Sequence, residues 1–149
     1  MGAGRVLVGI LIYIIAIVLI IIFVTLELSV DDISGMGFET SLFQAIFLTA
    51  LHPYSLLIIN GSWSIIAAIA TGAFIGGLIA KGTKAGIAVG IISFGILFLL
   101  QICVTFVFNF GELMAWYGPL GTTNVILDVT IGTGVSIVCG AIGGAITSD

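Results

Sequence analysis

One acidic residue, Asp128, lies inside a stretch of sequence that is otherwise suited to the interior of a lipid bilayer. Asn124 precedes it by four residues, so the two side chains share one face of a helix. A carboxylate is costly in hydrocarbon, and one found there is a candidate for binding a cation, relaying protons or holding a polar group of a substrate. Asp128 and Asn124 are therefore the first candidate site in this sequence.

A second polar row follows an earlier hydrophobic stretch. Gln101, Thr105 and Asn109 stand four residues apart, toward the same end of the membrane as Asp128. If the two helix faces meet, these side chains form one intramembrane polar cluster. The structural alternative is that Asp128 hydrogen-bonds Gln101, Thr105 or nearby backbone and fixes the register of two helices. We favour this alternative, because the penalty for a charge falls toward the interface and Asp128 lies about one turn inside it.

Groups suited to catalysis or metal binding are few. His52 is the only histidine, and it lacks the clustered Cys, His or acidic partners of a metal site. His52, Glu112 and Asp128 form the one set on the outer side that could support acid–base chemistry, and nothing in the sequence places them together. Cys103 and Cys139 are predicted to lie at different depths as free, buried and inert thiols. We therefore predict no enzymatic activity, no cofactor and no metal ion.

The composition defines the elements that must position these groups. Of 149 residues, 60% are hydrophobic and 7% are charged, against about 25% charged in soluble domains. A domain of this size leaves much of its surface exposed, so that surface must face lipid. Three basic residues cannot form a phosphate-binding face for DNA or RNA, which excludes nucleic acid as a partner. The sequence predicts a single membrane domain over residues 1–149.

Hydropathy predicts an all-α integral membrane protein, built as a four-helix transmembrane bundle. A membrane helix needs about 20 apolar residues, and the predicted spans cover about residues 6–26, 62–80, 85–108 and 124–147. The first apolar run is longer than a signal-peptide core and has no cleavage site after it, so it is expected to be a retained anchor.

Residues 41–59 leave an alternative open. Residues 42–59 are mostly apolar and would suffice for a fifth span. A fifth span would place Lys81 and Lys84 on the opposite side from Arg5, against the tendency of basic residues to stay in the cytoplasm. We predict instead a short helix at about residues 41–51, either at the outer interface or re-entrant.

The same tendency gives the orientation of the four-span model. Arg5, Lys81 and Lys84 fall on one side, so we expect both termini in the cytoplasm and the protein in the plasma membrane. The tripeptide Asn60-Gly61-Ser62 matches a glycosylation sequon and would lie outside, although such tripeptides also occur by chance.

Small residues recur at a spacing of four in three of the predicted spans. Such faces let helix backbones approach closely, and this contact holds helices together in lipid. We expect spans two and three to form a close antiparallel hairpin, the fourth to pack against it and the first to lie at the periphery. A pore wall or a sliding gate is the functional alternative to packing, and packing is favoured. The predicted packing residues are Gly72, Gly76, Gly86, Gly90, Gly140 and Gly144.

These features predict a non-catalytic accessory or structural subunit of a larger membrane complex. Its partners would be the lipid bilayer together with other membrane subunits or copies of itself. The alternative is a homo-oligomeric channel or transporter for an ion or small solute, with Asp128 as the coordinating group. A membrane enzyme is the least favoured function, since acid–base catalysis needs at least two positioned groups.

Overall fold

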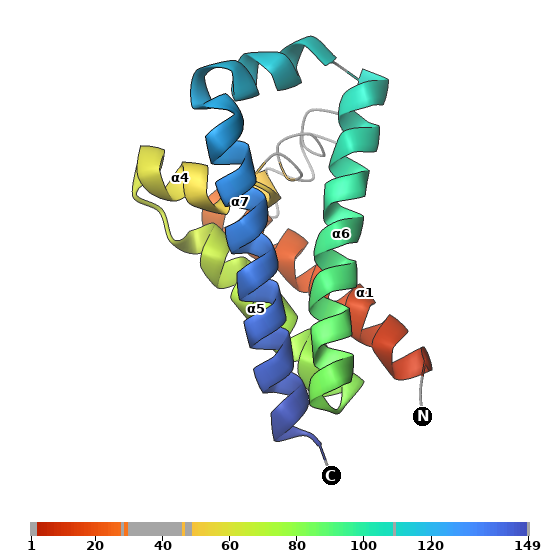
Figure 1. Cartoon of the computed structure of the whole chain (residues 1–149). Coiled ribbons are helices and arrows are strands. Elements are labelled where there is room, and N and C mark those ends of the chain that lie inside the picture. Colours follow the sequence, from red (N-terminus) through yellow and green to blue (C-terminus); the bar gives the residue numbers. More distant parts are fainter. Residues whose placement is uncertain (1–2, 28, 30–45, 47–48, 109, 149) are drawn as a thin grey trace.

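The computed structural model describes residues 3–27, 29, 46, 49–108 and 110–148; at residues 59–60 and 104–123 this description covers the backbone alone. Within these residues the regular structure is entirely helical (Figure 1). The elements are α1 (Ala3–Ile20), the π-helical turn η1 (Ile21–Thr25), α4 (Pro53–Asn60), α5 (Ser64–Ala80), α6 (Thr83–Phe108) and α7 (Phe110–Ile146).

In the part of the chain that the structure describes, three helical stretches are long and apolar enough to cross a membrane. They are Ala3–Thr25, Thr83–Cys103 and Asn124–Ile146, and they overlap the first, third and fourth predicted spans. Helices are the expected solution, because inside lipid every backbone amide and carbonyl must find its partner within the chain. The helix in the second predicted span, α5, is also apolar but has 17 residues. At 1.5 Å per residue it is about 25 Å long, shorter than a hydrocarbon core of about 30 Å.

Helix α1 has one buried face and one outward face. Gly9, Tyr13 and Ile17 are buried at helical spacing where α1 packs on α5 and α6. The Tyr13 hydroxyl also forms a 2.7 Å hydrogen bond with Oγ of Ser136 on α7. The first span, which was predicted to lie at the periphery, thus packs one face on the other helices. The opposite face presents large apolar side chains to the outside, among them Leu7, Leu11, Ile15 and Leu19.

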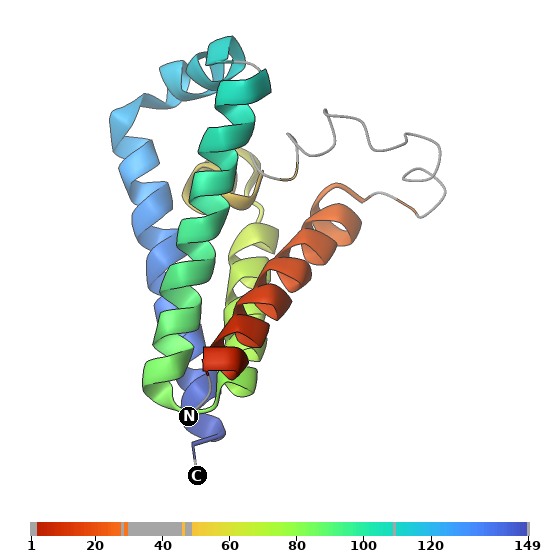
Figure 2. The ribbon, with the colours of Figure 1, turned by 90° about the vertical axis from the view of Figure 1, so that its right-hand side faces the viewer.

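Two glycines of α6, Gly86 and Gly90, face α7 at very short range. A Cβ added to Gly86 would overlap the carbonyl oxygen of Gly140, and one added to Gly90 would overlap that of Ser136. Near the end of α7, a Cβ on Gly144 would overlap the carbonyl oxygen of Gly82. Figure 2 shows α6 and α7 running side by side, which agrees with their extensive packing. Only hydrogen fits at these positions without moving a backbone.

The glycines of α5 face two different helices. A Cβ on Gly76 would lie 2.7 Å from the carbonyl oxygen of Gly9, so this surface meets α1. Gly72 lies on the same surface, against the backbone of Tyr13. Gly77, which spacing did not single out, faces Gly140 on α7. Gly76 also lies against the Val89 side chain of α6. In the predicted hairpin of spans two and three, the glycines of α5 therefore meet α1, α7 and a side chain of α6, and not the glycines of α6.

Hydrogen bonds between segments show which helix ends lie together. In the turn between α5 and α6, Gly82 has φ +103°, a conformation that favours glycine. Its amide donates to the carbonyl of Gly144, over 2.8 Å, so the end of α7 lies at this turn. At the other end of α5, the Thr25 hydroxyl donates to Oγ of Ser64 over 3.2 Å. Both chain termini lie toward the α5–α6 turn (Figure 1).

The connection expected at residues 109–123 is largely helical. Gly118-Pro119 has the chemistry of a turn, but α7 already begins at Phe110 and continues through both residues. Figure 1 shows the first part of α7 crossing one end of the molecule before the helix turns to run alongside α6. Proline inside a helix removes one backbone hydrogen bond and bends the helix without necessarily ending it. Pro119 lies within α7 and accounts for such a bend.

Candidate functional site

Asp128 lies on α7 and is 1% exposed, so its carboxylate must find its partners within the protein. Asn124, one turn earlier on α7, is half-buried. The groups around the carboxylate come from the start of α4, residues 52–55, more than 70 positions earlier in the chain. Two segments that are remote in sequence therefore meet at this acid.

Four hydrogen bonds hold the Asp128 carboxylate. Oδ1 accepts the backbone amide of Tyr54 at 2.7 Å and that of Ser55 at 2.9 Å. Oδ2 accepts the Ser55 hydroxyl at 2.5 Å and lies 3.1 Å from Nδ1 of His52. His52 and Ser55 are themselves buried. Both oxygens of the acid are thus used within the chain.

The first amides of α4 need a hydrogen-bond acceptor from elsewhere in the chain, and this need explains the role of the acid at position 128. Pro53 is the first residue of the helix, where its missing amide hydrogen does no harm. His52 precedes it without a side-chain capping bond, so the next amides lack the usual local acceptor. Asp128 accepts the amides of the second and third helical residues, as a capping side chain does, but from another helix. Its negative charge also suits the positive end of the helix dipole.

The order of these contacts argues against a catalytic relay. In a serine-nucleophile triad the histidine lies between the hydroxyl and the acid. Here the carboxylate of Asp128 contacts both the Ser55 hydroxyl and the His52 ring. Among the described residues no group of three His, Cys, Asp or Glu side chains is arranged to hold a metal ion. The geometry is that of a helix cap supplied by a side chain of another helix.

The structure describes only some of the side chains in the predicted intramembrane polar cluster. Gln101 is buried on α6, but the four hydrogen bonds of Asp128 all go to residues 52–55 and none reaches Gln101. The side chain of Thr105 and the whole of Asn109 lie outside the described residues, as does the side chain of Glu112.

His52 is the functional neighbour that sequence reasoning missed. It was expected on the outer side with nothing to place it near Asp128, yet it is 1% exposed and contacts the acid. A signal was present in the sequence: Pro53 predicts a helix start, and no Ser, Thr, Asp or Asn stands just before it to cap that helix. A buried helix start without a local cap requires a remote acceptor. Asp128 was the one acid predicted within a span.

The predicted short helix at residues 41–51 lies mostly outside the described residues. Ile46 and Ala50, which are described, are helical and buried. Leu51, which follows, is buried as well. These three side chains are therefore covered by other parts of the protein.

The cysteines are free, as expected, although Cys103 is exposed rather than buried and Cys139 is half-buried.

No protein-family model, curated protein or solved structure matches this chain. The function must therefore be argued from these residues.

Proposed function

We propose that this protein is a non-catalytic structural subunit of a membrane assembly. The observation that carries the proposal is the use of the Asp128 carboxylate as an internal cap for α4. A transport or catalytic acid needs free coordination sites or a proton acceptor positioned toward a substrate. Four intramolecular hydrogen bonds leave this carboxylate little capacity for a ligand.

The outward faces of the long helices support an environment of lipid and neighbouring subunits. In the most apolar 18-residue stretches of the three long helical segments, only 28% (Ala3–Thr25), 39% (Thr83–Cys103) and 22% (Asn124–Ile146) of the residues are buried within the chain. Most of the surface of these helices must therefore be covered by something else. Large apolar side chains recur on the uncovered faces, such as Leu99 on α6 and Ile126 and Val138 on α7. Such faces suit acyl chains and other membrane helices alike.

We further propose that α5 is a fourth span, with both termini in the cytoplasm of a plasma-membrane protein. Trp63, just before α5, is 65% exposed, and tryptophan prefers the membrane–water interface. Lys81 follows the other end of α5 and is a suitable cytoplasmic anchor. A short helix can cross when the bilayer thins locally around it.

Cysteine labelling tests this topology. In a variant without Cys103 and Cys139, single cysteines are placed at Glu27, Trp63 and Lys84, which are all exposed. On intact cells, a membrane-impermeant maleimide should label the first two positions, and the third should react only after permeabilisation. If the cysteines at Trp63 and Lys84 label from the same side, α5 does not cross.

Purification from the native host tests the subunit proposal. The tagged protein is extracted in mild detergent, separated by size-exclusion chromatography and analysed by quantitative mass spectrometry. We expect at least one membrane protein to co-elute at a fixed stoichiometry through a second separation. A protein that elutes alone, as a monomer or homo-oligomer, would contradict the proposal. A chain of similar hydropathy with the same tag serves as the control for non-specific association.

A homo-oligomeric channel or transporter is the second candidate, favoured by one observation. The buried contact between His52 and Asp128, at 3.1 Å, joins two titratable groups, and such pairs can relay protons in membranes. Asp128→Asn in reconstituted vesicles separates the two functions. Loss of proton or cation flux with intact assembly would favour transport, whereas parallel loss of folding favours the structural subunit.

A further inference from the structure

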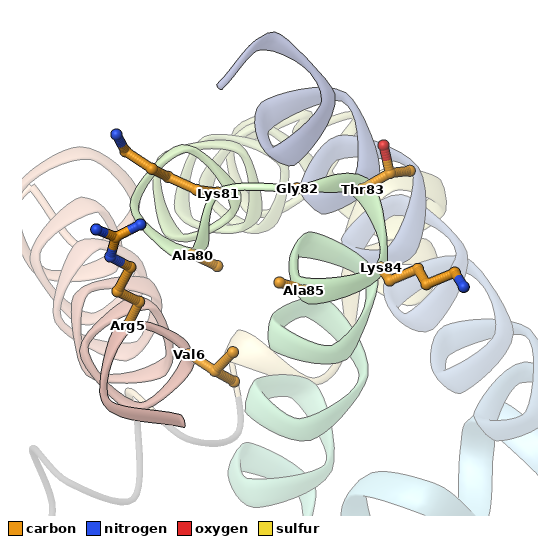
Figure 3. A pocket seen from close by; sticks show the side chains of 8 residues that line it. All are labelled: Arg5, Val6, Ala80, Lys81, Gly82, Thr83, Lys84 and Ala85. Atoms are coloured by element: carbon orange, nitrogen blue, oxygen red, sulfur yellow. The ribbon is translucent and has the colours of Figure 1, made fainter. Parts of the chain in front are cut away.

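All three basic residues of the chain line one open cavity. The cavity has a volume of about 830 Å³ and lies between the start of α1 and the α5–α6 turn. Arg5 contributes from α1, Lys81 from the turn and Lys84 from the first turn of α6 (Figure 3). Because the sequence has no other Lys or Arg, its entire basic charge is gathered here.

The cationic side chains are not equivalent. In Figure 3 the side chains of Arg5 and Lys81 extend to the same side of the cavity, whereas that of Lys84 extends away from both. Arg5 and Lys81 are thus placed to share one anion. Lys84 contributes mainly to the electrostatic potential at this end of the molecule.

The start of α6 adds hydrogen-bond donors to the same cavity. Thr83, Lys84 and Ala85 form the first turn of the helix and line the cavity. The amide of Gly86 is the first to bond back along the chain, to the carbonyl of Gly82 at 2.9 Å. The first amides of a helix lack intrahelical acceptors and carry the positive end of its dipole. They reinforce the preference of the cavity for an anion.

Acidic side chains described in the structure lie elsewhere. Asp128 is bonded to the start of α4, and Glu27 follows the opposite end of α1 from Arg5. Neither lines the cavity. The described part of the chain therefore leaves the positive charge of this cavity uncompensated.

We propose that this cavity binds the phosphate headgroup of an anionic phospholipid. Arg5 and Lys81 would contact the phosphate, since both arginine and lysine bind phosphate oxygens well. Val6, Ala80 and Ala85 give the cavity an apolar wall, which a lipid glycerol and upper acyl chain would cover and a free phosphate ion would not. The cavity lies at the ends of membrane-type helices, where headgroups are found, and basic pockets between such helices bind anionic headgroups.

Native mass spectrometry of the protein in a non-ionic detergent tests the proposal. The purified protein is titrated with phosphatidylglycerol, and separately with phosphatidylcholine. We expect a preference for phosphatidylglycerol, and Arg5→Gln or Lys81→Gln should each weaken its binding by about fivefold. Far-UV circular dichroism confirms that each variant keeps its helices.

Lys84→Gln is the comparison variant, because it removes the same charge from the lining of the same cavity. We expect it to weaken the binding of phosphatidylglycerol by less than about twofold, since its side chain points away from Arg5 and Lys81 and adds only to the electrostatic potential. Equal losses in all three variants would overturn the specific site and leave only a positive surface. Equal binding of the two lipids would also overturn it. If inorganic phosphate displaces the lipid at millimolar concentration, the assignment to a lipid is wrong.

Discussion

Replacing Asp128 with alanine should destabilise the protein by about 3–5 kcal/mol, because each buried donor left without its acceptor costs about 1–3 kcal/mol. The substitution deletes both acceptor oxygens at once. It leaves the amides of Tyr54 and Ser55, the Ser55 hydroxyl and Nδ1 of His52 buried without their acceptor. Buried donors without partners account for most of this loss.

Asp128→Asn should be less severe, because its amide oxygen can still accept the two backbone amides of α4. Its NH₂ group would then face the Ser55 hydroxyl in place of an acceptor. The free energy of unfolding is measured by titration with a denaturing detergent, followed by circular dichroism. Thr130→Val is the control: Thr130 is exposed on the same helix and bonds only the carbonyl of Ile126. A loss for Asp128→Ala no larger than for this control would contradict the structural role.

Gly86→Ala should have the second-largest effect and weaken the packing of α6 on α7 by about 1–3 kcal/mol, as overpacking does. A Cβ at this position would overlap the carbonyl oxygen of Gly140 and lie 2.8 Å from its carbonyl carbon. Both groups belong to helix backbones, so no side chain can rotate away. The two helices must separate, and the nearby contact of Gly90 with Ser136 loosens with them.

Gly95→Ala on the same helix is the matched control for Gly86→Ala. No heavy atom lies within 4 Å of a Cβ added to Gly95, and alanine is the better helix former. We expect Gly95→Ala to be neutral or slightly stabilising in the same unfolding titration. On α7, Gly140→Ala and Gly134→Ala form a second pair with the same contrast. Equal stability of the two variants in each pair would show that close backbone contact does not hold these helices together.

The positions of the membrane-type helices could be predicted from composition and length alone. Apolar runs of about 20 residues in a chain with so few charges are expected to form helices in lipid, because a helix satisfies its backbone hydrogen bonds within the segment. The same argument could not predict that residues 110–123 continue α7, because Gly118-Pro119 has the chemistry of a turn. Proline bends a helix in some contexts and ends it in others, and the surrounding structure decides which.

The glycine pattern predicted which helix faces are small, but not which helix each face meets. Spacing is a property of one helix, whereas pairing depends on how several helices fit together. Gly72 and Gly76 therefore looked suited to span three. In the structure both meet α1, and only Gly76 also contacts α6, through the Val89 side chain. Gly77 was not singled out because its contact with Gly140 falls outside the row that the spacing defined.

The importance of Asp128 could be predicted because an acid inside a span needs a partner. Its partners could not be predicted by the same reasoning, which looked along neighbouring spans and found Gln101. The partners belong to a short helix whose first residues were expected near the membrane surface. Helical periodicity carries no information on how deeply such a segment enters the protein.

Hydrogen–deuterium exchange is the most direct test of whether Asp128 holds the start of α4. Peptides covering Pro53–Asn60 are compared between the wild-type protein and the Asp128→Ala variant in the same detergent, with Thr130→Val as control. We predict that the amides of Tyr54 and Ser55 are protected in the wild-type and control proteins and exchange much faster in Asp128→Ala, while α6 keeps its protection. Unchanged protection of α4 in Asp128→Ala would contradict the anchor and return Asp128 to consideration as a transport group.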